Sequence, residues 1–111
     1  MDGDCLFCQI IAGERAADIV YEDEVLLAFK DINPHAPVHL LIVPRKHIRS
    51  VNEITPEDGP IVAAMIMRAR TLAQELHVDR SGYKLQINVE RGAGQVIFHL
   101  HMHLVGGWRR Q

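Results

Sequence analysis

The chain has 111 residues and a formal net charge of -2, and 48% of its residues are hydrophobic, which fits one folded domain and excludes wholesale disorder. With 12 basic and 14 acidic residues, the charge balance excludes a protein dedicated to nucleic-acid polymers or membrane surfaces. No stretch has the roughly 20 apolar residues of a membrane helix, and the acidic start at residues 1–4 does not resemble a signal peptide. We expect residues 1–111 to form a single cytoplasmic domain with no membrane or nucleic-acid partner.

The first half of the chain predicts one short helix and three strands. Apolar residues at helical spacing that end near Gly13 place the helix, and β-branched or aromatic runs between turn residues place the strands. An acidic turn joins the first two strands as a hairpin, and two prolines make the next segment a loop. The expected elements are a helix at 5–14, strands at 19–21 and 25–29, a loop at 31–37 and a strand at 38–43 that ends at Pro44.

The second half of the chain predicts one long helix and two strands. Thr55 and the proline and two acidic residues after it are typical of a helix start, with the first regular turn expected at Pro60. The expected elements are this helix to about His77, a turn at 79–82, a strand at 83–89, a glycine-rich loop at 91–95 and a strand at 97–105. Because strands outnumber helices without a βαβ repeat, we expect an α+β fold with a mostly antiparallel sheet.

Three histidines alternate with apolar residues in the last expected strand. Residues two apart on a strand share a face, so His99, His101 and His103 are predicted to point one way and their apolar neighbours into the core. Neighbouring Cα atoms then lie about 6.5–7 Å apart and the outer two about 13 Å apart. Metal–imidazole bonds are only about 2.0–2.1 Å long, so this spacing disfavours one ion held by all three rings. It favours a row of imidazoles along an extended substrate.

Imidazole is suited to phosphoryl chemistry at neutral pH. Its unperturbed pKa of about 6.5 leaves most of it neutral and nucleophilic near pH 7. One ring nitrogen can attack phosphorus while the other keeps its proton on a fixed acceptor, and a neighbouring ring can donate to the phosphate or the leaving group. Backbone N–H groups of the glycine-rich loop, residues 92–95, are further candidate donors to an anion.

The segment His99-Leu100-His101-Met102-His103-Leu104-Val105 resembles the signature of the histidine triad (HIT) family. The similarity covers nearly the whole chain and resembles most closely the nucleoside phosphoramidase (protein kinase C inhibitor-like) branch. The other segments that carry it are 6–14, 27–32, 36–48, Asn88, Gly94-Gln95 and Gly106-Gly107.

The resemblance implies a five-stranded antiparallel sheet with two helices, paired in a homodimer as a continuous ten-stranded sheet. It also implies a double displacement in which His101 attacks phosphorus and forms a nucleotidyl-histidine intermediate that water hydrolyses. By the same resemblance, His103 contacts the phosphate and assists the leaving group. His99 and His39 support the position and protonation of the nucleophile.

The resemblance further implies a site for a purine nucleotide or nucleoside phosphoramidate. Asp31 matches the carboxylate that accepts from the ribose hydroxyls. The apolar walls around the base match Leu6, Phe7, Phe29 and Ile32, and the phosphate-side positions match Asn88, Gly94 and Gln95. Val96 stands where the animal phosphoramidases have a serine near the leaving group, and because valine donates no side-chain hydrogen bond, the leaving-group preference of this chain stays open.

Cys5 and Cys8 have the C-x2-C spacing that lets two thiolates bind one zinc ion. A redox pair and two unpaired thiols are the alternatives, although the thioredoxin-like βαβ context of a redox pair is absent. Some relatives in the HIT family complete a zinc site with two histidines, and the matching positions here are His47 and His99. Such a closed Cys2His2 site is structural, because it leaves no position for an activated water.

The sequence thus predicts a hydrolase that cleaves nucleoside 5′-phosphoramidates or related nucleotidyl esters. Three alternatives remain: a dinucleoside polyphosphate hydrolase, a non-catalytic nucleotide-binding regulator, and a zinc-dependent hydrolase whose metal is bound by the strand histidines. The presence of both His101 and His103 favours catalysis over binding alone, and the strand geometry disfavours the zinc hydrolase.

Overall fold

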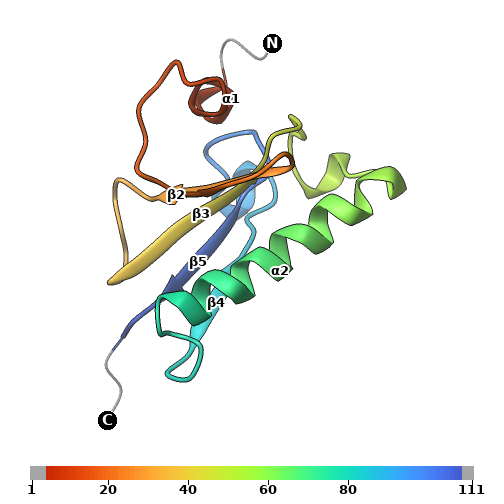
Figure 1. Ribbon diagram of the computed structural model, residues 1–111. Coiled ribbons are helices and arrows are strands. Elements are labelled where there is room, and N and C mark those ends of the chain that lie inside the picture. The colour runs from red at the N-terminus through yellow and green to blue at the C-terminus, as the bar shows by residue number, and fades with distance from the viewer. Residues whose placement is uncertain (1–4, 109–111) are drawn as a thin grey trace.

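The computed structural model describes residues 5–108, which form one five-stranded antiparallel sheet with helices on both faces (Figure 1). The strand order is β1-β2-β3-β5-β4, and each strand pairs antiparallel with its neighbour. The strands are β1 Ile19–Glu22, β2 Leu26–Lys30, β3 Val38–Pro44, β4 Tyr83–Gln86 and β5 Met102–Gly106. The predicted α+β antiparallel fold with two helices is confirmed.

The two helices cover opposite faces of the sheet (Figure 1). Helix α1 (Leu6–Ile11) and helix α2 (Gly59–Glu75) each pack on one apolar layer, and the central strand β3 contributes to both. Its Leu40 and Ile42 belong to the layer beneath α2, whereas Leu41 and Val43 belong to the layer beneath α1. This alternation is the period of two of a strand buried on both faces.

Helix α2 begins at Gly59, one residue before the expected first regular turn at Pro60, and follows a 3-10 turn, Pro56–Asp58. The Asp58 carboxylate accepts from the Thr55 backbone N–H at 3.0 Å and from Lys46 Nζ at 2.7 Å. The apolar residues that α2 buries against the sheet are Met65, Ala69, Leu72 and Ala73. None of the helices among residues 5–108 is long and apolar enough to span a membrane.

The predicted strand at 97–105 is wrong in its first half, because β5 begins only at Met102. Residues 97–101 form no regular strand. Within this segment the Leu100 N–H donates to the Ile48 carbonyl, 2.6 Å away, in the loop after β3. The predicted strand at 83–89 is also too long, since β4 ends at Gln86, opposite His103 of β5. Only one of the three clustered histidines therefore lies on a strand.

Candidate active site and metal centre

A cavity of about 490 Å³ opens on the α1 face of the sheet, between α1, the end of β2 and the loop before β5. The side chains that reach this face from the sheet come from the odd-numbered positions of the strands, such as Phe29 and Leu41. The sequence-predicted residues that line the cavity are Leu6, Phe7, Phe29, Asp31, Ile32, Gly94, His101 and His103. Asn88 and Gln95 are not among its lining residues.

Aromatic edges form the inner wall of this cavity. Phe7 of α1 is buried and meets the ring of Phe29 with centroids 5.4 Å apart and the ring of His101 at 5.1 Å, both edge-on. Ile32 lies at the mouth, 88% exposed. An apolar wall with one exposed lip suits a flat ring such as a nucleobase.

Asp31 is the carboxylate of the cavity. Its side chain is 18% exposed, and its Oδ1 accepts from the Asn33 backbone N–H at 2.8 Å. Its Oδ2 lies 3.4 Å from His39 Nε2. A half-buried carboxylate at the end of β2 remains able to accept from hydroxyl groups in the cavity.

The protonation state of His101 is set by one backbone carbonyl. Nδ1 of His101 lies 2.7 Å from the His99 carbonyl oxygen, which can only accept, so Nδ1 carries the proton. Nε2 of the neutral ring then holds the free lone pair. Burial lowers the pKa of His101, more strongly than the His99 carbonyl raises it, which keeps the ring neutral. His101 is therefore in the form that a nitrogen nucleophile needs.

The protonation state of His103 follows from His39 in the same way. The His35 backbone N–H donates to His39 Nδ1 at 3.0 Å, so neutral His39 carries its proton on Nε2. That N–H donates to His103 Nδ1 at 2.9 Å, which leaves the His103 proton on Nε2. Burial lowers the pKa of His39, and burial with the neighbouring imidazoles lowers the pKa of His103 to about 4.

His101 and His103 thus present complementary groups to one cavity. Their ring centroids are 5.2 Å apart, with a lone pair on Nε2 of His101 and an N–H on Nε2 of His103. A phosphorus atom between them would meet a nucleophile on one ring and a hydrogen-bond donor on the other.

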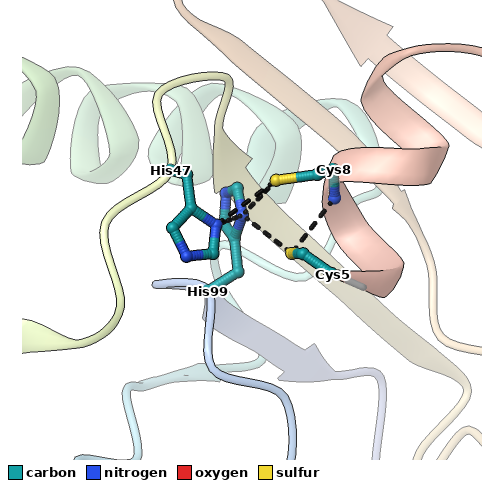
Figure 2. A group of neighbouring side chains, drawn as sticks. All are labelled: Cys5, Cys8, His47 and His99. Atoms are coloured by element: carbon teal, nitrogen blue, oxygen red, sulfur yellow. Dashed lines mark hydrogen bonds between the residues drawn. The ribbon is translucent and has the colours of Figure 1, made fainter. Parts of the chain in front are cut away.

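Four side chains converge on a second centre beside α1, as Figure 2 shows. The ligand atoms of Cys5, Cys8, His47 and His99 all lie within 4.8 Å of one another. The His99 Nδ1 atom is 3.4 Å from Cys5 Sγ, 3.5 Å from Cys8 Sγ and 3.2 Å from His47 Nδ1. A zinc tetrahedron with bonds of about 2.0–2.3 Å has ligand–ligand edges of roughly 3.3–3.8 Å. The donor set and its spacing therefore fit a zinc ion.

His99 has the tautomer that a metal ligand requires. Its Nε2 lies 2.8 Å from the Pro44 carbonyl oxygen, so Nε2 carries the proton and the lone pair of Nδ1 faces the two cysteines. The side chain is fully buried. The prediction that His99 shares a strand face with His101 and His103 is wrong, because residue 99 lies in the irregular segment before β5. The ring of His99 lies in the second centre, and its backbone carbonyl accepts from Nδ1 of His101.

A second candidate metal group, Asp31, His39 and His103, has ligand atoms within the same 4.8 Å. Hydrogen bonding already accounts for the approach of His39 to His103. Among residues 5–108, neither candidate group contains more than one of the three clustered histidines. The geometry thus disfavours a metal held by the histidine row.

The glycine-rich loop uses most of its own N–H groups internally. The backbone N–H groups of Ala93, Gly94 and Gln95 donate to the carbonyls of Glu90 and Arg91, so they are not free for an anion. In the part of the chain that the structure describes, no hydrogen bond uses the N–H of Val96, whose residue is 83% exposed at the cavity edge. Val96, which directly follows the loop, thus offers a backbone donor at the edge of the cavity.

Asn88 and Gln95 shape this loop from inside. Asn88 Nδ2 donates to the Ala93 carbonyl at 2.6 Å. Gln95 is buried, its Nε2 donates to the carbonyls of Arg49 and Ile97, and its Oε1 accepts from the Glu90 N–H. These contacts engage both side chains in holding the loop, and neither residue lines the cavity.

Glu90 is a residue that sequence reasoning missed. Its φ of +66° and ψ of 170° lie in a region that essentially only glycine occupies and that costs other residues about 1–3 kcal/mol. Its carboxylate accepts from Arg49 at 2.9 Å and from the Ser50 hydroxyl at 2.8 Å, and these two bonds, Arg49 first, lower the pKa of Glu90. No local sequence signal marks a glutamate in such a conformation.

Comparison with known proteins gives one consistent result. The family model described as "Scavenger mRNA decapping enzyme C-term binding" matches residues 4–108. The purine nucleoside phosphoramidase of Escherichia coli (strain K12) is 40% identical over 107 residues, which span 96% of this chain and 90% of that protein. This family model and this relative extend over nearly the whole chain.

Solved structures of similar chains share the architecture. A HIT family hydrolase from Legionella pneumophila Philadelphia 1 has a TM-score of 0.94 and 46% identity, covering 96% of this chain and 95% of that one. A Zn-bound histidine triad family protein from Mycobacterium smegmatis has a TM-score of 0.82 and 35% identity, covering 96% and 76%.

Proposed function

This chain belongs to the histidine triad family, and we propose that it hydrolyses nucleoside 5′-phosphoramidates or related nucleotidyl esters through a nucleotidyl-histidine intermediate. The observation that carries the proposal is the complementary pair in the cavity, a free lone pair on His101 and an N–H on His103. Two backbone groups impose this pair, the His99 carbonyl on His101 and, through His39, the His35 N–H on His103.

In the first step, Nε2 of His101 attacks phosphorus and the bond from phosphorus to the leaving group breaks. The imidazole becomes positively charged as the new N–P bond forms, and its Nδ1–H donates to the His99 carbonyl throughout, which stabilises that charge. The Nε2–H of His103 and the N–H of Val96 donate to the phosphate oxygens or the departing atom. As the first bond breaks, the Nε2 proton of His103 passes to the departing group. In the second step, water attacks phosphorus, the N–P bond breaks to release neutral His101, and the proton that water loses returns to Nε2 of His103.

The cavity supports a purine nucleotide as the bound group. Its apolar walls, with Phe7 and Phe29 edge-on to each other, suit a flat base, and Asp31 suits two ribose hydroxyls. The E. coli relative at 40% identity is named a purine nucleoside phosphoramidase, which agrees with this chemistry. Val96, which carries no hydroxyl, leaves recognition of the leaving atom to His103 and to backbone.

We propose that Cys5, Cys8, His47 and His99 bind a structural zinc ion. All four positions of a tetrahedron are protein ligands, so the ion supplies a rigid link between α1 and the loops at 47 and 99 rather than an activated water. The zinc-bound relative from M. smegmatis supports the metal. Two thiolates kept reduced fit a cytoplasmic location, which we also propose.

We propose that the chain forms a homodimer with a continuous ten-stranded sheet. Strand β4 is an edge strand, since it pairs only with β5 in the described sheet, and its Leu85 is 40% exposed. Pairing with a second copy would cover that edge. The mass in solution is then about twice the 12.5 kDa of one chain.

The test of the proposed reaction is intact mass spectrometry after mixing the protein with adenosine 5′-phosphoramidate and quenching without acid. The expected result is a nucleotidyl adduct on the unmodified protein and none on the His101→Ala variant. His103→Ala should still bind nucleotide but lose about 10²–10⁴-fold in turnover.

Glu22→Gln is the control variant, because Glu22 pairs with Arg45 on the surface and does not line the cavity. If the protein binds AMP but forms no adduct and shows no turnover, the remaining interpretation is a non-catalytic nucleotide-binding regulator. Cleavage of dinucleoside polyphosphates in preference to phosphoramidates would favour the neighbouring activity of the family.

A further inference from the structure

Glu90 and His77 are the two non-glycine residues with positive φ among residues 5–108. His77, at φ +60°, directly follows the end of α2, where chains commonly turn left-handed. Glu90 terminates no helix, and its combination of φ +66° and ψ 170° is one that essentially only glycine adopts easily. Such a residue persists only when its surroundings hold it there, and this strain points to a role for its side chain.

Contacts on both sides of the backbone hold Glu90 in place. The carboxylate bridges Arg49 and the buried hydroxyl of Ser50, which belong to the segment that follows β3. The Glu90 N–H donates to Gln95 Oε1, and its carbonyl accepts from Ala93 and Gln95. Glu90 therefore joins the segment after β3 to the glycine-rich loop.

That loop contributes to the cavity in which we propose that the phosphate binds. Gly94 and Val96 line the same cavity as His101 and His103, and Val96 carries the available N–H. The side chain of Gln95, between them, also donates to the carbonyls of Arg49 and Ile97. Any shift of Glu90 would therefore move Gly94 and Val96 relative to the two histidines.

We infer that Glu90 is a positioning residue: its carboxylate, anchored on Arg49 and Ser50, sets Gly94 and the Val96 N–H at the distance from His101 that a phosphate requires. This inference rests on the proposed function for the identity of the bound group. It assigns no contact between Glu90 and substrate, because the carboxylate is occupied behind the loop. Its effect reaches the cavity through Gly94 and Val96, because Glu90 itself is not among the lining residues.

The variant that tests the inference is Glu90→Gly, which removes the carboxylate and also relieves the backbone strain. Loss of fold is thus not its expected outcome. The expected result is a fall in kcat of about 10–100-fold, since a displacement of about 1 Å at a reacting group costs about this much. AMP should bind about 10-fold more weakly, whereas adenosine, which lacks phosphate, should bind with unchanged affinity.

Two variants complete the experiment. Glu90→Gln keeps the shape and one acceptor oxygen, and should recover most of the kcat and of the AMP affinity. His77→Gly is the matched control, because it also replaces a non-glycine residue of positive φ, at a place outside the cavity. It should leave the kcat, the AMP affinity and the adenosine affinity unchanged.

The amide resonances of Gly94 and Val96 give a readout that needs no turnover. In the unmodified protein they should shift on addition of AMP more than on addition of adenosine, and in Glu90→Gly this difference should disappear. The inference is overturned if Glu90→Gly keeps its kcat and AMP affinity, or if it loses adenosine binding and cooperative unfolding together. If the protein does not hydrolyse phosphoramidates, the proposed reaction is wrong. The comparison of AMP affinity with adenosine affinity would still test the role of Glu90.

Discussion

Single backbone groups decide the chemistry of the histidines in the cavity. A carbonyl at residue 99 and an N–H at residue 35 each leave one tautomer of a neutral ring. The buried surroundings keep the rings neutral, because charging an imidazole there would cost solvation free energy. A nucleophile and a donor thus arise from the same side-chain type, two positions apart.

At the residue scale, the low pKa of His103 predicts a loss of stability in acid. Its folded-state pKa is about 4, against 6.5 for the ordinary group, so below pH 6.5 the unfolded chain binds the proton more readily than the folded one. The free energy of unfolding should therefore be fully present above pH 6.5 and fall between pH 6.5 and pH 4. At pH 5 the contribution of His103 is at most about 2 kcal/mol.

Urea unfolding at pH 7.5, 6 and 5 measures this contribution. His103→Gln should flatten the dependence on pH, whereas His77→Gln, at an exposed side chain that does not line the cavity, should leave the slope as it is. Equal slopes in the unmodified protein and in His103→Gln would contradict the assigned burial of the neutral ring.

Helix α2 ends in a motif that usually has glycine at its position of positive φ, and this chain has His77 there. The Val78 N–H donates to the Ala73 carbonyl and the His77 N–H to the Gln74 carbonyl, which is the bonding pattern of a Schellman ending. Val78 is buried in the core beside the helix end. The residue with positive φ in this motif is His77.

His77→Gly should therefore stabilise the protein by about 1 kcal/mol, because glycine adopts positive φ without the steric cost of a Cβ atom. Urea or thermal unfolding measures the change. His77→Val, which adds a β-branched side chain at the same φ, should destabilise the fold. A destabilised His77→Gly variant would show that the imidazole makes a contact worth more than the relieved strain.

At the scale of the whole molecule, the cysteine and histidine cluster joins parts of the chain that share no strand pairing. Helix α1 packs on the sheet through Phe7 and Ile10, and the cluster ties its first turn to residues 47 and 99 (Figure 2). Because the His99 carbonyl also accepts from His101 Nδ1, the proposed zinc site and the proposed nucleophile share one residue. Loss of the ion should therefore affect both stability and turnover.

Protein prepared without added zinc should contain about one zinc ion per chain. A chelator should lower the midpoint of thermal unfolding, since an ion present at about 100 times its Kd stabilises the folded state by about 2.7 kcal/mol. The double variant Cys5→Ser and Cys8→Ser should unfold at the lower midpoint with or without zinc. A preparation with no metal and no response to the chelator would remove the proposed zinc site.

Local sequence patterns were enough to predict the fold class, and the resemblance to the histidine triad family predicted part of the cavity lining. Apolar residues that recur every two positions indicate a strand, and those that recur every 3.6 positions indicate a helix. Both patterns lie within one segment, so they can be recognised without knowing the tertiary structure. The antiparallel sheet was therefore predictable. The gathering of Phe7, Asp31, His101 and His103 at one site was predicted by the family resemblance instead.

Three features became visible only in the folded chain: where β5 begins, which ring nitrogen carries the proton in the four histidines discussed above, and that Gln95 is buried outside the cavity. Each of these depends on a hydrogen bond between distant segments, such as Leu100 to Ile48, His99 to Pro44 and Gln95 to Arg49. A buried N–H or carbonyl must find a partner, and the packed chain determines which one is within reach. For the same reason, the strained backbone of Glu90 leaves no trace in the local sequence pattern.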